Sequence, residues 1–102
     1  MEIDLEKDTA VREWMKGEGW PRTERAVFEP DPQTGFWVWR EERFGEPSPT
    51  LAIHESLVRY SAPQELTAIL RVVGVADALR RHSRVRLWEG GRLTGYGRKD
   101  PP

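Results

Sequence analysis

The sequence of 102 residues contains no cysteine. Disulfide bonds and thiol chemistry are therefore excluded, and a reducing compartment is the expected location. The N-terminal residues 1–8 are charged and lack the apolar run of a signal peptide, and no segment is long and apolar enough for a membrane-spanning helix. These absences predict a cytoplasmic protein that does not bind membranes.

Histidine is scarce as well, with only His54 and His82 in the chain. A metal site needs several convergent histidine, cysteine or carboxylate ligands, and the acidic residues of this sequence are dispersed. A phosphate-binding loop needs glycines before a helix, whereas Gly90 and Gly91 join two predicted strands. The sequence therefore predicts no metal and no cofactor.

The run His54-Glu55-Ser56 places a base, an acid and a hydroxyl side by side. On a strand, His54 and Ser56 would share one face about 7 Å apart, too far for a direct hydrogen bond. On a helix they would not face each other. Catalytic sites of the Ser-His-Asp type bring their members together from different elements, so we interpret this run as an exposed strand end and predict no catalytic residues.

The residues that are present fit one small domain, with 37% hydrophobic and 32% charged residues and five tryptophans. Residues 1–51 hold seven basic and twelve acidic residues, a net charge of −5, and residues 52–102 carry +4. This asymmetry fits attraction between the two halves of one fold, head-to-tail association, or a basic face for an anionic partner.

Hydrophobic periodicity and turn residues predict a single α+β domain over residues 1–97 and a loose C-terminal tail over 98–102. The expected elements are a helix over 3–16, strands over 24–29, 36–43 and 50–54, two short helices separated by Gly74, and strands over 84–89 and 92–97. Residues 55–60 fit either a strand extension or a helical turn. We expect an antiparallel sheet of about five strands, made of two hairpins and one short strand, with the N-terminal helix and the central helical pair on one face.

Two local signals set boundaries within this fold. The run 61–64 is typical of a helix start, with Ser61 as cap, Pro63 in the first turn and Gln64 in the position of a capping box. Gly90-Gly91 predicts a two-residue hairpin turn. In that register, Glu89 would face Arg92 as an opposite-charge pair.

Residues 36–39 form a predicted strand that is apolar on both faces, whereas a half-exposed strand should alternate. Either both faces are covered, or one face is a binding surface. Two tryptophans share one face of this strand, and two arginines and a tryptophan share a face of the strand over 84–89. Together they make a candidate interaction surface formed by Trp37, Trp39, Arg84, Arg86 and Trp88.

Such a surface is open to three interpretations. It could be a protein interface, because tryptophan and arginine are favoured anchors there. It could stack bases and hold phosphates. In the third interpretation there is no such surface, because helices cover the tryptophan pair and the arginines lie in solvent. A candidate basic patch would add Arg80, Arg81, His82 and Arg92, although a pI near 6.1 is low for a nucleic-acid-binding domain.

Three functional hypotheses follow. The first is a non-enzymatic protein-interaction module or small subunit of an assembly, of which a homodimer is one form. The second is a nucleic-acid-binding accessory protein that uses the C-terminal arginine and tryptophan side chains. The third is a small-ligand binder or enzyme with a pocket between sheet and helices.

Overall fold

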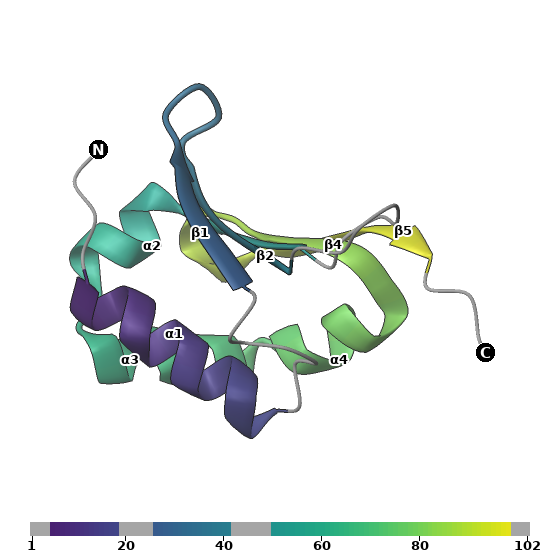
Figure 1. The fold of residues 1–102 in the computed structure, drawn as a ribbon, viewed down its shortest axis with the longest axis horizontal. Helices are drawn as coiled ribbons and strands as arrows, with labels where there is room; N and C mark the ends of the chain where they lie inside the picture. Colours follow the sequence, from purple (N-terminus) through teal and green to yellow (C-terminus); the bar gives the residue numbers. More distant parts are fainter. Residues whose placement is uncertain (1–4, 19–25, 42–49, 99–102) are drawn as a thin grey trace.

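A computed structural model describes residues 5–18, 26–41 and 50–98 of the chain, and all structural statements concern these residues. The helices are α1 (Leu5–Gly17), α2 (Glu55–Tyr60), α3 (Pro63–Val72) and α4 (Val75–Arg81). The strands are β1 (Ala26–Asp31), β2 (Phe36–Glu41), β3 (Thr50–His54), β4 (His82–Leu87) and β5 (Leu93–Arg98), with a short 3-10 turn η2 (Glu89–Gly91) before β5. The predicted α+β fold is confirmed, with α1, α3 and α4 below the sheet (Figure 1).

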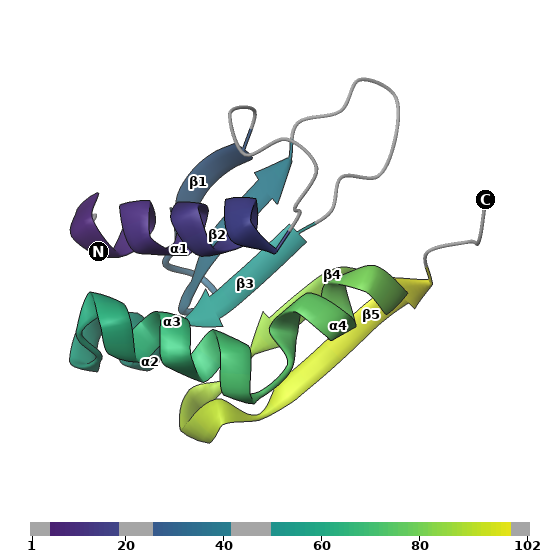
Figure 2. The same cartoon turned by 90° about the horizontal axis from the view of Figure 1, so that it is seen from below.

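The sheet has the order β1-β2-β3-β4-β5, which follows the order of the strands along the chain. All neighbours are antiparallel except β3 and β4, which are parallel. The expectation of a purely antiparallel sheet is therefore wrong at this one pair. Three helices connect β3 to β4 and return the chain to the end at which β3 began, as a parallel pair requires. Figure 2 shows these helices and α1 lying across the same face of the sheet.

The local signals for helix boundaries are confirmed in part. Gly74 adopts a left-handed φ of 80° and separates α3 from α4, so the central helices are two, as predicted. Pro63 opens α3, but the N-cap is Ala62 and makes no side-chain hydrogen bond, so the capping box does not form. Ser61 is instead the C-cap of α2. Residues 55–60, for which the sequence fitted either a strand extension or a helical turn, form this helix.

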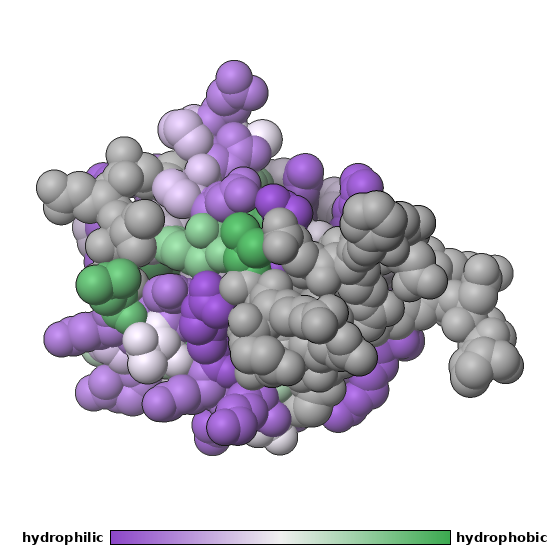
Figure 3. All heavy atoms as spheres, viewed as in Figure 1, coloured by the Kyte–Doolittle hydropathy of each residue, from purple (hydrophilic) through white to green (hydrophobic). Residues whose placement is uncertain are grey.

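The hydrophobic core lies between the helices and the sheet. On α1 it includes Val11, Trp14 and Met15, whereas Leu5 is 72% exposed. The strands and the later helices contribute Trp37, Trp39, Leu51, Ile53, Val58, Leu66, Leu70, Val75, Ala78, Leu79, Val85 and Leu87. Hydrophobic residues also show in a band between the sheet and α1 on the side seen in Figure 3, where hydrophilic residues colour most of the remaining surface.

A polar contact inside this layer ties α1 to β2. The indole Nε1 of Trp39 donates a hydrogen bond to Oδ1 of Asp8 over 2.9 Å. The same oxygen accepts from Nε of Arg12, also at 2.9 Å, so the carboxylate is held from both sides. The ring of Phe28 lies 4.7 Å from that of Trp39, centroid to centroid. A buried donor that is satisfied in this way fixes the position of α1 on the sheet.

The turn between β4 and β5 differs from the prediction by one residue. The amide of Trp88 donates to the carbonyl of Arg92 over 2.7 Å, and the loop comprises the three residues of η2, with positive φ at both glycines. Trp88, and not Glu89, therefore lies opposite Arg92. A slip by one residue would turn Leu93 away from the core, which explains why packing sets this register.

None of the helices in the described ranges combines the length and apolar character that crossing a membrane requires.

Candidate interaction surface on the open face of the sheet

The strand β4 has two different sides, as its sequence predicts. Val85 and Leu87 are fully buried beneath the helices, whereas Arg84 and Arg86 are exposed on the other side. In Figure 1 the helices α1, α3 and α4 lie on one side of the sheet, and we call the opposite side the open face. The candidate surface must therefore be sought there.

Trp37 and Trp39 do not lie on this face. They are 4% and 0% exposed, and Trp39 is aligned in the sheet with Leu51, a core residue. Leu51 in turn is aligned with Val85, so the whole row faces the helices. The predicted surface of five residues is thus corrected, because the two indoles belong to the core and only Arg84, Arg86 and Trp88 remain together.

The open face has aromatic members that the sequence analysis did not select. Phe36 makes edge-to-face contacts with His54 and Trp88, with ring centroids 5.4 and 4.9 Å apart. The guanidinium carbon of Arg86 lies 5.4 Å from the ring centroid of Phe36, 5.5 Å from that of Tyr96 and 6.0 Å from that of Trp88. Phe36 is buried, and His54, Trp88 and Arg86 are among the side chains that pack against it.

Trp88 is held from two directions. Its Nε1 donates to Oγ1 of Thr94 over 2.7 Å, and the guanidinium of Arg92 lies 5.1 Å from its ring centroid. Such cation–π contacts hold an arginine without neutralising it. We refer below to the arginine–aromatic cluster, which consists of Phe36, Arg86, Trp88, Arg92 and Tyr96.

The predicted basic patch is divided between two ends of β4. Arg80 and Arg81 end α4, and His82 begins β4, whereas Arg92 follows the turn at the far end of that strand, about 17 Å away by strand rise. Arg80 also pairs with Asp77 over 3.2 Å. The ring of His82 packs against Gly95, where a Cβ atom would lie 2.3 Å from His82 Cδ2. The four residues therefore do not form one patch.

The described arginines of this part of the open face are Arg84 and Arg86 on β4 and Arg92 after the turn η2. Within the described ranges, no carboxylate pairs with Arg84, Arg86 or Arg92. An acidic partner occurs only nearer the opposite edge of the sheet, where Glu29 pairs with Arg40 over 3.1 Å. Three guanidinium groups thus remain available to an anion from outside.

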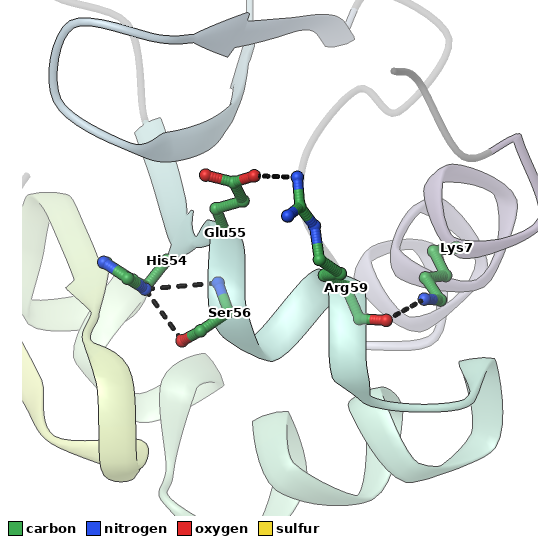
Figure 4. Close-up of polar contacts among 5 residues, drawn as sticks. All are labelled: Lys7, His54, Glu55, Ser56 and Arg59. Carbon is green, nitrogen blue, oxygen red and sulfur yellow. Dashed lines mark hydrogen bonds and ion pairs between the residues drawn. The ribbon is translucent and has the colours of Figure 1, made fainter. Parts of the chain in front are cut away.

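His54 and Ser56 are much closer than a strand would allow (Figure 4). Nδ1 of His54 lies 2.8 Å from Oγ of Ser56, and the predicted separation of about 7 Å is wrong because β3 ends at His54 and α2 begins at Glu55. Glu55 pairs with Arg59, whose carbonyl accepts from Nζ of Lys7 over 3.2 Å. The contact between His54 and Ser56 therefore lies at the junction between β3 and α2.

The geometry of this junction is that of a helix cap. Nδ1 of His54 also accepts from the backbone N–H of Ser56 over 3.2 Å, so the ring satisfies one of the free amides at the start of α2. A catalytic base needs a third group to orient it, and no described side chain bonds to the other ring nitrogen. We interpret the pair as structural.

Two hollows lie on the helical side of the molecule. One of about 580 Å³ runs between α1 and α3 and includes Glu13, Trp14 and Arg71 in its lining. The other, of about 350 Å³, is bordered by α2, α3 and η2 and is mainly apolar. Neither lies between sheet and helices, where the third hypothesis places a pocket. No three or more His, Asp or Glu side chains of the described ranges are close enough to hold a metal ion.

Comparison with protein-family models, with curated proteins and with solved structures gives no match for this chain. The open face is therefore interpreted from its own side chains.

Proposed function

We propose that this protein is a non-enzymatic interaction module that binds an acidic polypeptide segment on the open face of its sheet. The observation that carries the proposal is that Arg84, Arg86 and Arg92 have no carboxylate partner within the described residues. A guanidinium binds a carboxylate through two parallel hydrogen bonds, which makes acidic side chains the matching ligand.

The arginine–aromatic cluster supports a protein partner in a second way. Tryptophan, tyrosine and arginine carry a large share of binding energy at protein interfaces. Arg86 and Arg92 already lie against aromatic rings, so less side-chain freedom is lost when a ligand binds. The surface is thus partly organised before a partner arrives.

A homodimer built on residues 36–39 was one form of this module. The reason to expect this homodimer was an exposed apolar strand, but Phe36, Trp37 and Trp39 are all buried within one protomer. The proposed binding surface instead consists of charged side chains of β4 and of the turn that follows it.

Single-stranded nucleic acid is a second candidate, favoured by the combination of arginines with Trp88 and Tyr96 on an open sheet face. Two observations weigh against it. The guanidinium of Arg92 already lies over the ring of Trp88, which leaves less of that ring for bases. The pI near 6.1 is also low for a nucleic-acid-binding domain.

A binding titration separates these candidates. The full chain is added to a fluorescent glutamate-rich peptide, to its glutamine counterpart and to a single-stranded thymidine oligonucleotide, at low and high salt. We expect the glutamate peptide alone to bind, with an affinity that falls as salt rises. Tighter binding of the oligonucleotide would favour the second candidate, and binding of neither would overturn both.

A pair of matched variants tests the surface itself. Arg86→Ala with Arg92→Ala should weaken peptide binding at least about tenfold, because the carboxylates of the peptide lose two guanidinium partners. Arg80→Ala with Arg81→Ala removes the same charge at the other end of β4 and should change the affinity much less. Equal losses in the two double variants would mean that net charge, and not the arginine–aromatic cluster, governs binding.

A further inference from the structure

The strand β5 forms one edge of the sheet and borders the proposed binding surface. Among the described strands it pairs with β4 alone, so the backbone groups on its outer side have no partner strand. Such an edge is a template for an additional strand.

The hairpin identifies the outward groups. The bond from the amide of Trp88 to the carbonyl of Arg92 marks these two residues as a hydrogen-bonded pair. The pairing stays regular from Leu93 to Tyr96, before the positive φ of Gly97, so hydrogen-bonded and non-hydrogen-bonded pairs alternate over this stretch. The backbone groups of Thr94 therefore point toward β4, whereas those of Leu93 and Gly95 point outward.

The two edges of the sheet differ in how accessible they are to another strand. β1 contains Pro30, which has no N–H to donate, between the acidic residues Glu29 and Asp31. Proline and charge are common means of protecting an edge. β5 has neither a proline nor an acidic residue. β5 is the unprotected edge.

The charges near β5 select the occupant. A strand added to this edge would place every second side chain on the open face beside Tyr96, about 10 Å from Arg84 and Arg86 on β4. Extended glutamate and arginine side chains together span that distance. A second copy of β5 has no acidic residue and would therefore offer no carboxylate to these arginines.

We infer that β5 accepts an acidic, extended peptide segment as a sixth strand of the sheet. This inference rests on the proposed function, because it specifies how the acidic segment is bound. Main-chain hydrogen bonds to Leu93 and Gly95 supply affinity, and the arginines of the open face select glutamate or aspartate at alternate positions.

Amide hydrogen exchange of the full chain, followed by NMR, tests the main-chain contacts. The probe is a peptide of alternating glutamate and threonine. We expect exchange at Leu93 and Gly95 to slow at least about tenfold when the peptide is bound, because their amides become hydrogen-bonded. Exchange at Phe28 on the opposite edge, whose amide lies on the same outward side of β1 as Pro30, should not change. Slowing at Phe28 instead would place the peptide on the wrong edge and overturn the inference.

A second peptide separates this inference from the proposed function. It carries the same charges but is N-methylated at every second residue, which removes the donors that would face β5. We expect it to bind at least about tenfold more weakly than the unmodified peptide. Equal binding of the two peptides, with unchanged exchange at Leu93 and Gly95, would overturn strand addition and leave the proposed function standing. Binding of neither peptide would overturn both.

Discussion

The two faces of the sheet use aromatic side chains in opposite ways. Beneath the helices, Trp39 is fully buried and its one polar atom is bonded to Asp8. On the open face, Tyr96 is 45% exposed and the rings lie against guanidinium groups. Phe36 and Trp37 are neighbours on β2 yet belong to opposite faces, because successive residues of a strand point to opposite sides. Stability is expected to depend on the covered face, and binding on the open one.

The largest effect on stability is expected from Trp39→Ala. The change should lower the free energy of unfolding by about 3–5 kcal/mol, because it removes a fully buried indole from the core. Chemical denaturation followed by circular dichroism measures this loss. The control is Tyr96→Ala on the open face, for which we expect a loss below about 1 kcal/mol. Comparable losses of stability in the two variants would contradict the view that stability depends mainly on the covered face.

A smaller loss is expected when Asp8 is replaced. Asp8→Ala leaves the buried Nε1 of Trp39 without an acceptor and should cost about 1–3 kcal/mol of stability. Asp8→Asn keeps an oxygen acceptor at that position and should cost less. In a Trp39→Phe background the alanine change should lose most of its effect, and an undiminished effect would show that the contact with Trp39 is not its cause.

The smallest effect on stability is expected from Arg92→Ala on the open face. The guanidinium contributes one exposed cation–π contact with Trp88, worth about 0.5–1 kcal/mol. The same denaturation experiment measures it, and the fluorine NMR spectrum of fluorotryptophan-labelled protein reports whether the indole of Trp88 moves. A loss as large as that of Asp8→Ala would make Arg92 a structural residue and weaken its assignment to binding.

The fold class and the two sides of β4 could be predicted because both depend on local patterns. The alternation of arginines with Val85 and Leu87 shows directly which residues are buried. The strand over residues 36–39 gives no such signal, since it is apolar throughout. Its orientation is set by tertiary contacts such as the bond between Trp39 and Asp8, which are 31 positions apart in the sequence.

Phe36 and Tyr96, the aromatic members of the cluster that the sequence analysis did not select, had a weaker signal in the sequence. Counting alternate positions from Trp37 places Phe36 on the opposite face, but nothing local indicates which face is open. The cluster also needs β2, β4 and β5 to come together, and the parallel pairing of β3 with β4 depends on how three helices return the chain. The contact between His54 and Ser56 depended on where a strand changes into a helix, a boundary that periodicity left open.

The packing of His82 against Gly95 has a consequence for sequence variation. The imidazole occupies the space that any β-carbon at position 95 would need, so the two positions cannot be chosen independently. An alanine at 95 requires a smaller side chain at 82, and the two replacements should be tolerated far better together than the first alone. The imidazole of His82 thereby fills the face of β5 at Gly95 with a side chain that comes from the neighbouring strand.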